Sequence, residues 1–221
     1  MPTSTVEDYL KSILKHMPPE PGGLVSMGQI GSDLRVAPGT VTAMVKTLAE
    51  SGLVEYEPYS GVRLTKAGRQ LALHVLRRHR LIELFLVQVV GLDWSEVHDE
   101  AERMEHAVSD RLIERLDALL GHPTVDPHGD PIPTLQGRLT PQDHLRGLLE
   151  CEPGEEIVIQ RVVDQSEEFL RLLDREGLKP GSRWRVLEED LAADTMELGQ
   201  GDKRLRLGRR AASKLLVEPA G

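Results

Sequence analysis

The residues best suited to chemistry lie between His98 and His106. If this segment is helical, with about 100° of rotation per residue, then His98, Glu102, Glu105 and His106 share one helix face. Neighbouring carboxylates repel each other unless a cation lies between them. A mixed set of nitrogen and oxygen donors suits a borderline divalent ion such as Mn, Fe, Co or Zn. The spacing therefore predicts a metal site on this helix.

A second pair of donors precedes this segment. His79 and Glu83 are four residues apart, on what we predict to be the preceding helix. Two facing helices would then each contribute imidazole and carboxylate groups. The alternative is that both pairs lie on the solvated faces of acidic helices and bind no metal.

The elements that must position these donors begin with a helix-turn-helix pattern. Apolar residues recur at helical spacing over residues 4–16, 26–34 and 40–51. Two short strand-like runs follow, at residues 53–56 and 62–65, with a turn-rich segment between them. Two helices joined by a tight turn and followed by a hairpin predict a winged helix-turn-helix. A helical hairpin packed on an unrelated small sheet is the alternative.

The rest of the chain is predicted to form a helical region and a small β-barrel. The helical region contains two long helices, at residues 68–90 and 95–120. The β region contains one helix near residues 167–175 and four alternating runs, at residues 156–163, 183–187, 195–198 and 204–207. We therefore predict a mainly α protein with small β parts and three domains, at residues 1–73, 74–140 and 141–221.

Composition narrows the class of protein. The 221 residues contain 39% apolar side chains, which is enough for a core, but only 3% aromatic ones. Few aromatics argue against a β-sandwich and against base stacking on single-stranded nucleic acid. The longest apolar stretch, residues 81–92, is too short to cross a bilayer, and a single cysteine, Cys151, cannot form an internal disulfide. We expect a cytoplasmic protein that is not in a membrane.

The net charge of −9 first counts against a nucleic-acid partner. The charge is uneven, however. Residues 1–80 contain ten lysines and arginines and seven acidic residues, a net charge of +3, so the remainder carries −12. The predicted DNA-binding region is thus mildly basic, and the acidic excess lies in the predicted metal-binding and C-terminal regions.

Three segments of the chain resemble the metal-dependent regulators of the diphtheria toxin repressor family. They are Val97 to His106, Arg78 to Glu83 and Gly129 to Pro133. The resemblance implies a winged-helix DNA-binding domain, a helical domain that binds metal and dimerises, and a C-terminal SH3-like (FeoA-like) domain. It also implies a transcriptional repressor of metal-ion homeostasis genes, not an enzyme, with Mn(II) or Fe(II) as co-repressor.

The same resemblance implies two metal sites per chain. The primary site would use Asp8, Glu102, Glu105 and His106. The ancillary site would use three residues of the helical region and two of the SH3-like domain, namely His79, Glu83, His98, Gln165 and Glu168. The last two residues stand in the order Gln then Glu, whereas the iron-responsive pattern has Glu then Gln.

Two substitutions bear on the metal. Asp8 and Glu102 stand where iron-responsive members have Met and Cys, and hard oxygen donors favour Mn(II) over Fe(II). The manganese-responsive branch has a second acid one turn after the aspartate, where this chain has Lys11. An ammonium group there competes with a cation, so we expect one primary and one ancillary ion in place of a two-metal cluster.

These residues suggest how metal would act. Asp8 belongs to the DNA-binding domain and its co-ligands to the helical domain, so metal binding would lock one domain against the other and favour the DNA-competent geometry. On DNA, the second helix of the motif would enter the major groove. Thr40 and Thr42 are candidates for base or phosphate contacts, and Lys46 and Arg63 for phosphate contacts.

The predicted partners are a palindromic double-stranded operator and a second copy of the chain. Apolar residues that exceed the needs of one helix pair occur at Leu112, Leu116, Leu119, Leu120 and residues 84–90. Two other functions are weighed: a winged-helix regulator with a purely structural metal site, and a metallohydrolase. The sequence contains no HExxH motif, and a metallohydrolase would leave the winged helix without a role.

Overall fold

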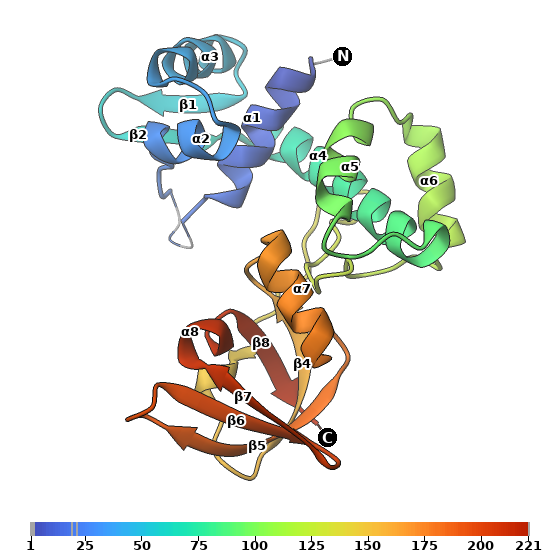
Figure 1. The fold of residues 1–221 in the computed structure, drawn as a ribbon. Helices are drawn as coiled ribbons and strands as arrows, with labels where there is room; N and C mark the ends of the chain where they lie inside the picture. Colours follow the sequence, from blue (N-terminus) through green and yellow to red (C-terminus); the bar gives the residue numbers. More distant parts are fainter. Residues whose placement is uncertain (1–2, 19, 21, 221) are drawn as a thin grey trace. The chain divides into compact units, whose positions relative to one another are not determined.

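The computed structural model describes residues 3–18, 20 and 22–220 (Figure 1). Its contacts divide the chain into two units. The first unit comprises Met1–His79, Glu105–Val108 and Pro133–Leu139. The second comprises Arg80–Met104, Ser109–Ile132 and Thr140–Gly221. Within the described residues, no helix is both long and apolar enough to cross a membrane.

Three helices open the first unit, at α1 (Ser4–Lys15), α2 (Met27–Leu34) and α3 (Pro38–Glu50). Their starts follow from local chemistry. Ser26 and Gln29 form a capping box at the start of α2, and Pro38 occupies the first turn of α3, where its missing N–H costs nothing. The left-handed conformation of Arg35 ends α2. The predicted helix-turn-helix is confirmed, with α3 starting two residues earlier than predicted.

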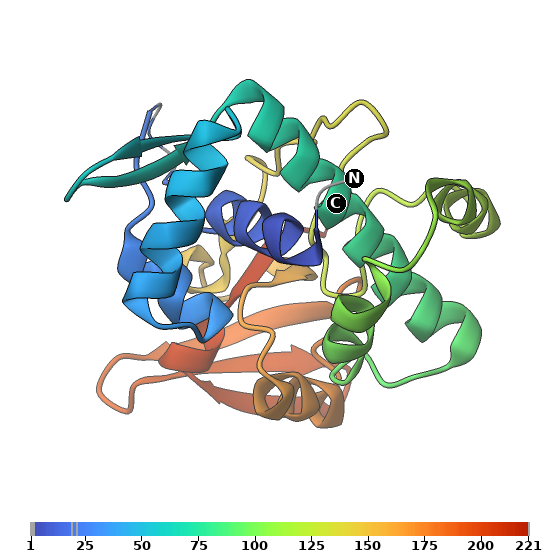
Figure 2. The ribbon, with the colours of Figure 1, turned by 90° about the horizontal axis from the view of Figure 1, so that it is seen from above.

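The predicted wing is a two-stranded antiparallel hairpin of β1 (Val54–Glu57) and β2 (Gly61–Leu64). It extends from the helices of its unit (Figure 2). Val62 also pairs with Val25, whose N–H donates to the Val62 carbonyl at 2.8 Å. A Cβ on Gly61 would lie 2.5 Å from the Val25 oxygen, so this close approach requires glycine.

The core of the first unit consists of buried side chains from all three helices and from the hairpin. They are Tyr9, Leu10, Ile13, Val25, Ile30, Val41, Val45, Leu48, Val54, Val62 and Ala72. The apolar positions of α3 that the sequence pattern predicts to face inward are Val41, Met44, Val45 and Leu48; three are buried, and Met44 is half-buried.

The helical region contains α4 (Lys66–Phe85), which continues as a π-turn over Leu86–Val90, and then α5 (Val97–Met104) and α6 (Asp110–Leu119). The prediction of one helix over residues 95–120 is wrong. The helix ends at Met104, and the Ser109 side chain accepts a hydrogen bond from the Leu112 N–H and thereby starts a new helix. Glu105 and His106 therefore lie in the turn that follows α5 and not on its face.

The C-terminal region forms a six-stranded antiparallel sheet in the order β3-β8-β4-β5-β6-β7. The strands are β3 (Arg146–Gly147), β4 (Glu156–Val162), β5 (Arg183–Asp190), β6 (Thr195–Gln200), β7 (Lys203–Gly208) and β8 (Leu215–Pro219). Among the described residues β3 does not pair with β7, so the sheet is not the closed barrel that was predicted. Short helices lie at Leu148–Glu150 (η2), Glu167–Glu176 (α7) and Arg209–Ala212 (α8).

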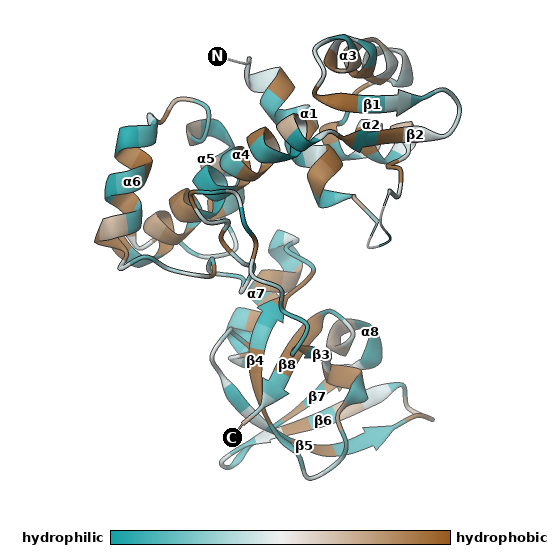
Figure 3. Ribbon diagram, turned by 180° about the vertical axis from the view of Figure 1, so that it is seen from behind, coloured by the Kyte–Doolittle hydropathy of each residue, from teal (hydrophilic) through white to brown (hydrophobic). Residues whose placement is uncertain are grey.

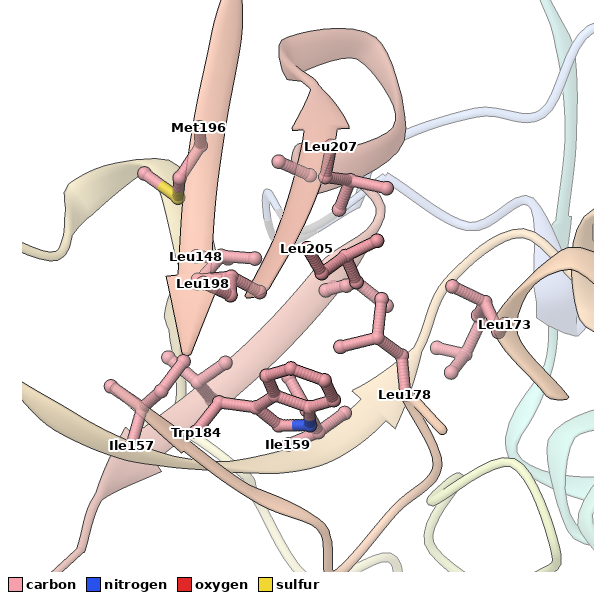
Figure 4. Packing of buried hydrophobic residues seen from close by; sticks show 14 of the residues in the cluster. Leu148, Ile157, Ile159, Leu173, Leu178, Trp184, Met196, Leu198, Leu205 and Leu207 are labelled. Atoms are coloured by element: carbon pink, nitrogen blue, oxygen red, sulfur yellow. The ribbon is translucent and has the colours of Figure 1, made fainter. Parts of the chain in front are cut away.

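Alternation along these strands creates the core of the second unit. Hydrophilic and hydrophobic residues alternate along the strands in Figure 3, and the burial of β7 follows the same period of two. The inward side chains, among them Ile157, Ile159, Trp184 and Leu198, pack in one cluster (Figure 4). Trp94, from the loop before α5, belongs to the same cluster.

Candidate metal centre

The first unit contains a cluster of donors around the buried Glu105. Asp8, Glu105 and His106 each offer a ligand atom, and these atoms lie within 4.8 Å of one another. His106 Nε2 is 2.8 Å from Asp8 Oδ1 and 3.3 Å from Glu105 Oε1. Glu105 is fully buried. Two carboxylate oxygens and one imidazole nitrogen therefore converge on a small space, as a divalent cation requires.

Other charged side chains complete this cluster. Lys11 Nζ donates to Glu105 Oε1 at 2.5 Å, and His79 Nδ1 lies 2.7 Å from Glu105 Oε2. The other ring nitrogen of His106, Nδ1, donates to Glu7 Oε2 at 2.7 Å. The sequence prediction missed Glu7, because one acidic residue in the first turn of an amphipathic helix is normally a solvated one.

The protonation of His106 depends on these neighbours. Burial alone would lower the pKa of its imidazole, but the hydrogen bond to Glu7 and the charges of Asp8 and Glu105 raise the pKa above its ordinary value. These neighbours thus favour the protonated, positively charged form of the His106 imidazole.

The second unit contains another donor cluster, formed by Glu83, Asp126 and His128. Their ligand atoms lie within 4.8 Å of one another, and all three residues are buried. The His128 Nε2–H donates to the Trp94 carbonyl at 2.9 Å, which leaves the lone pair on Nδ1. Nδ1 is buried and has no hydrogen-bond partner among the described residues. An orphaned imidazole nitrogen facing two carboxylates fits a divalent cation, and a bond from the other ring nitrogen to a carbonyl is the usual support of a metal-binding histidine.

The charges at this second cluster are only partly balanced. Burial raises the pKa of Asp126 well above its usual range, and the charges of Asp130 and Glu83 act in the same direction, while Arg80 opposes them. Arg80 Nε is 3.6 Å from Asp126 Oδ2, and its guanidinium is 3.5 Å from Asp130. The negative charge of an ionised Asp126 is therefore not fully balanced, and a bound cation would balance it.

The loop from Asp126 to Asp130 is held by the C-terminal sheet. The Val162 N–H donates to the His128 carbonyl at 2.9 Å, and Arg161 pairs with Asp130 at 2.5 Å. Gly129 has φ +88°, and a Cβ on it would overlap the Gln160 carbonyl oxygen. The strand β4 thus fixes the backbone that carries His128.

Comparison with known proteins gives the family. Residues 1–62 match the family described as "Iron dependent repressor, N-terminal DNA binding domain", residues 65–134 match "Iron dependent repressor, metal binding and dimerisation domain", and residues 146–219 match "FeoA domain". The iron-dependent repressor IdeR of Mycobacterium leprae is 32% identical over an alignment of 226 positions, which covers 97% of this chain and 96% of that protein. The diphtheria toxin repressor of Corynebacterium efficiens is 32% identical over 84% of each chain. The chain belongs to the diphtheria toxin repressor family.

Solved structures support this membership. A manganese-dependent transcriptional repressor in complex with manganese is 38% identical, with a TM-score of 0.84 over 97% of this chain and 99% of that one. The manganese regulator SloR is 33% identical, with a TM-score of 0.73 over 99% of both chains. The predicted diphtheria toxin repressor fold, with its DNA-binding, helical and C-terminal β parts, is confirmed.

Of the four residues that resemblance to the diphtheria toxin repressor family assigned to the primary site, three belong to the first unit and one to the second. Asp8, Glu105 and His106 meet in the first unit. Glu102 lies in the second unit, where its Oε1 is 3.6 Å from His98 Nε2.

The residues assigned to the ancillary site have the following contacts within each unit. Glu83 Oε1 is 3.2 Å from His98 Nδ1 in the second unit, whereas His79 contacts Glu105 in the first. Gln165 donates to Asp130 at 2.8 Å, and the exposed Glu168 has no hydrogen bond or ion pair among the described residues. The prediction missed Asp126 and His128, which follow no helical or strand periodicity in the sequence.

The four residues predicted to contact DNA lie on α3 and on the wing. Thr40 and Lys46 are exposed on α3, while the Thr42 hydroxyl donates to the Pro38 carbonyl at 3.0 Å. Arg63 pairs with Glu55 at 2.6 Å and with Glu57 at 3.0 Å on the same face of the hairpin. The wing's own carboxylates thus offset the charge of Arg63.

Proposed function

We propose that this chain is a metal-dependent DNA-binding transcriptional repressor of metal-ion homeostasis genes. The observation that carries the proposal is the meeting of Asp8 with Glu105 and His106. Asp8 belongs to the part of the sequence that matches a DNA-binding domain, and the other two belong to the part that matches a metal-binding and dimerisation domain. A cation held by all three residues therefore joins the two parts.

The coupling follows from the charges at this cluster. Without metal, the carboxylates of Asp8 and Glu105 repel each other, and a proton on His106 and the ammonium of Lys11 oppose that repulsion. A divalent cation supplies a stronger attraction and fixes α1 against the turn after α5. Since metal and operator both favour this arrangement, each increases the affinity for the other by the same factor.

We propose a second site at Glu83, Asp126 and His128. The buried and unpartnered Nδ1 of His128 supports it, as does the raised pKa of Asp126. Glu83 is one of the residues first assigned to the ancillary site, whereas Asp126 and His128 replace the donors expected from the C-terminal domain. The chain would then bind two ions, one in each unit.

We propose Mn(II) as the co-repressor, with Fe(II) as the alternative. Both donor sets contain one imidazole and two carboxylates, with no sulfur ligand. Hard oxygen donors suit Mn(II), and the comparison structures include a manganese-dependent repressor in complex with manganese.

We further propose that the repressor binds a palindromic operator as a homodimer. The exposed residues of α3, among them Thr40 and Lys46, are available to the major groove. Leu112 on α6 is 48% exposed and Leu119 is 64% exposed, whereas Leu116 is buried within the chain. A second copy of the chain would cover the two exposed leucines, which a solvated helix has no reason to present together.

The test is operator binding by fluorescence anisotropy, with DNA selected by this protein from a random pool. We expect Mn(II) to increase affinity at least tenfold and a chelator to reverse the increase. The Asp8→Ala variant should lose the increase while retaining the ion of the second unit. DNA binding that is equally strong with and without metal would mean that the metal is only structural, and it would contradict the proposal. Absence of any DNA binding would also contradict it.

A further inference from the structure

Glu7 occupies an unusual position in the first-unit cluster. It precedes Asp8 on α1, yet it is only 7% exposed, so its carboxylate is buried in the first turn of a helix. Burying a carboxylate is costly unless it is paired or hydrogen-bonded. Among the described residues, Glu7 is paired with His106 Nδ1 at 2.7 Å and with a guanidinium nitrogen of Arg78 on α4 at 3.7 Å.

The two ring nitrogens of His106 are divided between adjacent residues of α1. Nδ1 faces Glu7, and Nε2 faces Asp8 at 2.8 Å. An ionised carboxylate can only accept a hydrogen bond, so Glu7 requires the proton to be on Nδ1. In the neutral ring the lone pair is then on Nε2, which is the nitrogen directed at the oxygens of Asp8 and Glu105.

We propose that Glu7 is a positioning residue for the metal centre: it selects the His106 tautomer whose Nε2 lone pair faces Asp8 and Glu105. This inference rests on the proposed function. Glu7 acts through the imidazole and does not itself bind the ion, because its Oε2 is directed at Nδ1, the ring nitrogen that does not face the ion. Arg78 stabilises the orientation of the Glu7 carboxylate from α4. A carboxylate that orients a metal-bound histidine in this way typically increases metal affinity ten- to a hundredfold.

The first experiment measures Mn(II) binding to the full chain by the loss of the free-ion EPR signal. The wild type should bind two ions, and Asp8→Ala should bind one. In Glu7→Gln, which keeps the shape of the side chain but loses its charge, one of the two affinities should fall about ten- to a hundredfold. Glu50→Gln removes the same charge from an exposed position of the first unit and should leave both affinities unchanged. Unchanged affinities in Glu7→Gln would overturn the inference.

The second experiment separates a positioning residue from a ligand. Co(II) bound to a thiolate gives a near-ultraviolet charge-transfer band, so a cysteine reports whether its position touches the ion. Asp8→Cys should give the band, and Glu7→Cys should not; the wild type, whose Cys151 is buried outside both clusters, supplies the baseline. A band in Glu7→Cys would make position 7 a ligand position and overturn the inference. The proposed function fails separately, if Asp8→Ala still binds two ions and Asp8→Cys gives no band.

Discussion

Lys11 and Glu105 form a buried ion pair, with Nζ 2.5 Å from Oε1 and with 4% and 0% of the two residues exposed. The same Glu105 oxygen is 3.3 Å from His106 Nε2, so the ammonium group lies beside the proposed ion. A tethered cation at this point offsets part of the acidic charge of the cluster. If the first unit binds metal as proposed, we expect this ion pair to limit it to a single ion and to stabilise the cluster when metal is scarce.

Replacing Lys11 with methionine should lower the free energy of unfolding of the metal-free protein and increase the stabilisation that metal provides. Glu105 would lose its partner while buried, and breaking such a pair typically costs about 3–5 kcal/mol. A divalent ion would then compensate for more charge than in the wild type, so saturating Mn(II) should raise the free energy of unfolding further in Lys11→Met than in the wild type. Urea unfolding with and without Mn(II) measures both increments. Equal increments would show that Lys11 does not compete with the ion.

Gly129→Ala should disrupt the second-unit cluster selectively. The new Cβ would overlap the Gln160 carbonyl oxygen, and the positive φ adds strain of about 1–3 kcal/mol. Because the backbone on both sides must move, His128 would lose its place beside Asp126, and one of two Mn(II) ions should be lost in an EPR titration. Gly201→Ala is the matched control, since Gly201 has φ +58° but open space around its Cβ position. Retention of both ions in Gly129→Ala would contradict the role of β4 in fixing this loop.

The sequence was most informative where structure is local. The periodicity of α1 to α3, the turn at Pro38 and the alternation in the C-terminal strands predicted the three parts of the fold. The break between α5 and α6 was missed because the helical pattern of apolar residues continues across it. The only local signal is the cap residue Ser109, whose side-chain hydrogen bond competes with continuation of the helix.

The donor sets were harder to predict than the fold. Spacing along one predicted helix identified Glu105 and His106 as candidate donors, but their partners Asp8 and Glu7 lie almost 100 residues away in the chain. Only the family resemblance pointed to Asp8, and Glu7 was missed. The cluster of Glu83, Asp126 and His128 joins α4 to a loop, and the support of His128 comes from the Trp94 carbonyl. Neither relationship has a period that a single sequence can reveal.

Trp94 should report metal binding in the second unit. Its ring is stacked on His128 with centroids 5.6 Å apart, and its carbonyl accepts the His128 Nε2–H. A paramagnetic ion on Nδ1 should therefore quench the fluorescence of Trp94. The chain has one other tryptophan, the buried Trp184. Trp184→Phe should retain the Mn(II)-dependent decrease in emission and Trp94→Phe should lose it; a decrease of equal size in both variants would place the ion elsewhere.

Asp164 should make the C-terminal domain sensitive to acid. Burial opposes ionisation of its carboxyl, but hydrogen bonds from Lys214, at 2.5 Å, and from Ser166 lower its pKa to about 2. A pKa below the unfolded value contributes stability that is present above about pH 4 and is lost as the pH falls toward 2. Because the side chains of Lys214 and Asp164 are 28% and 31% exposed, we expect the pair to contribute at most about 1 kcal/mol to the free energy of unfolding. Urea unfolding should show Asp164→Asn less stable than the wild type at pH 6, with the difference shrinking between pH 4 and 2, and a difference that stays constant would mean that the Asp164 charge contributes nothing.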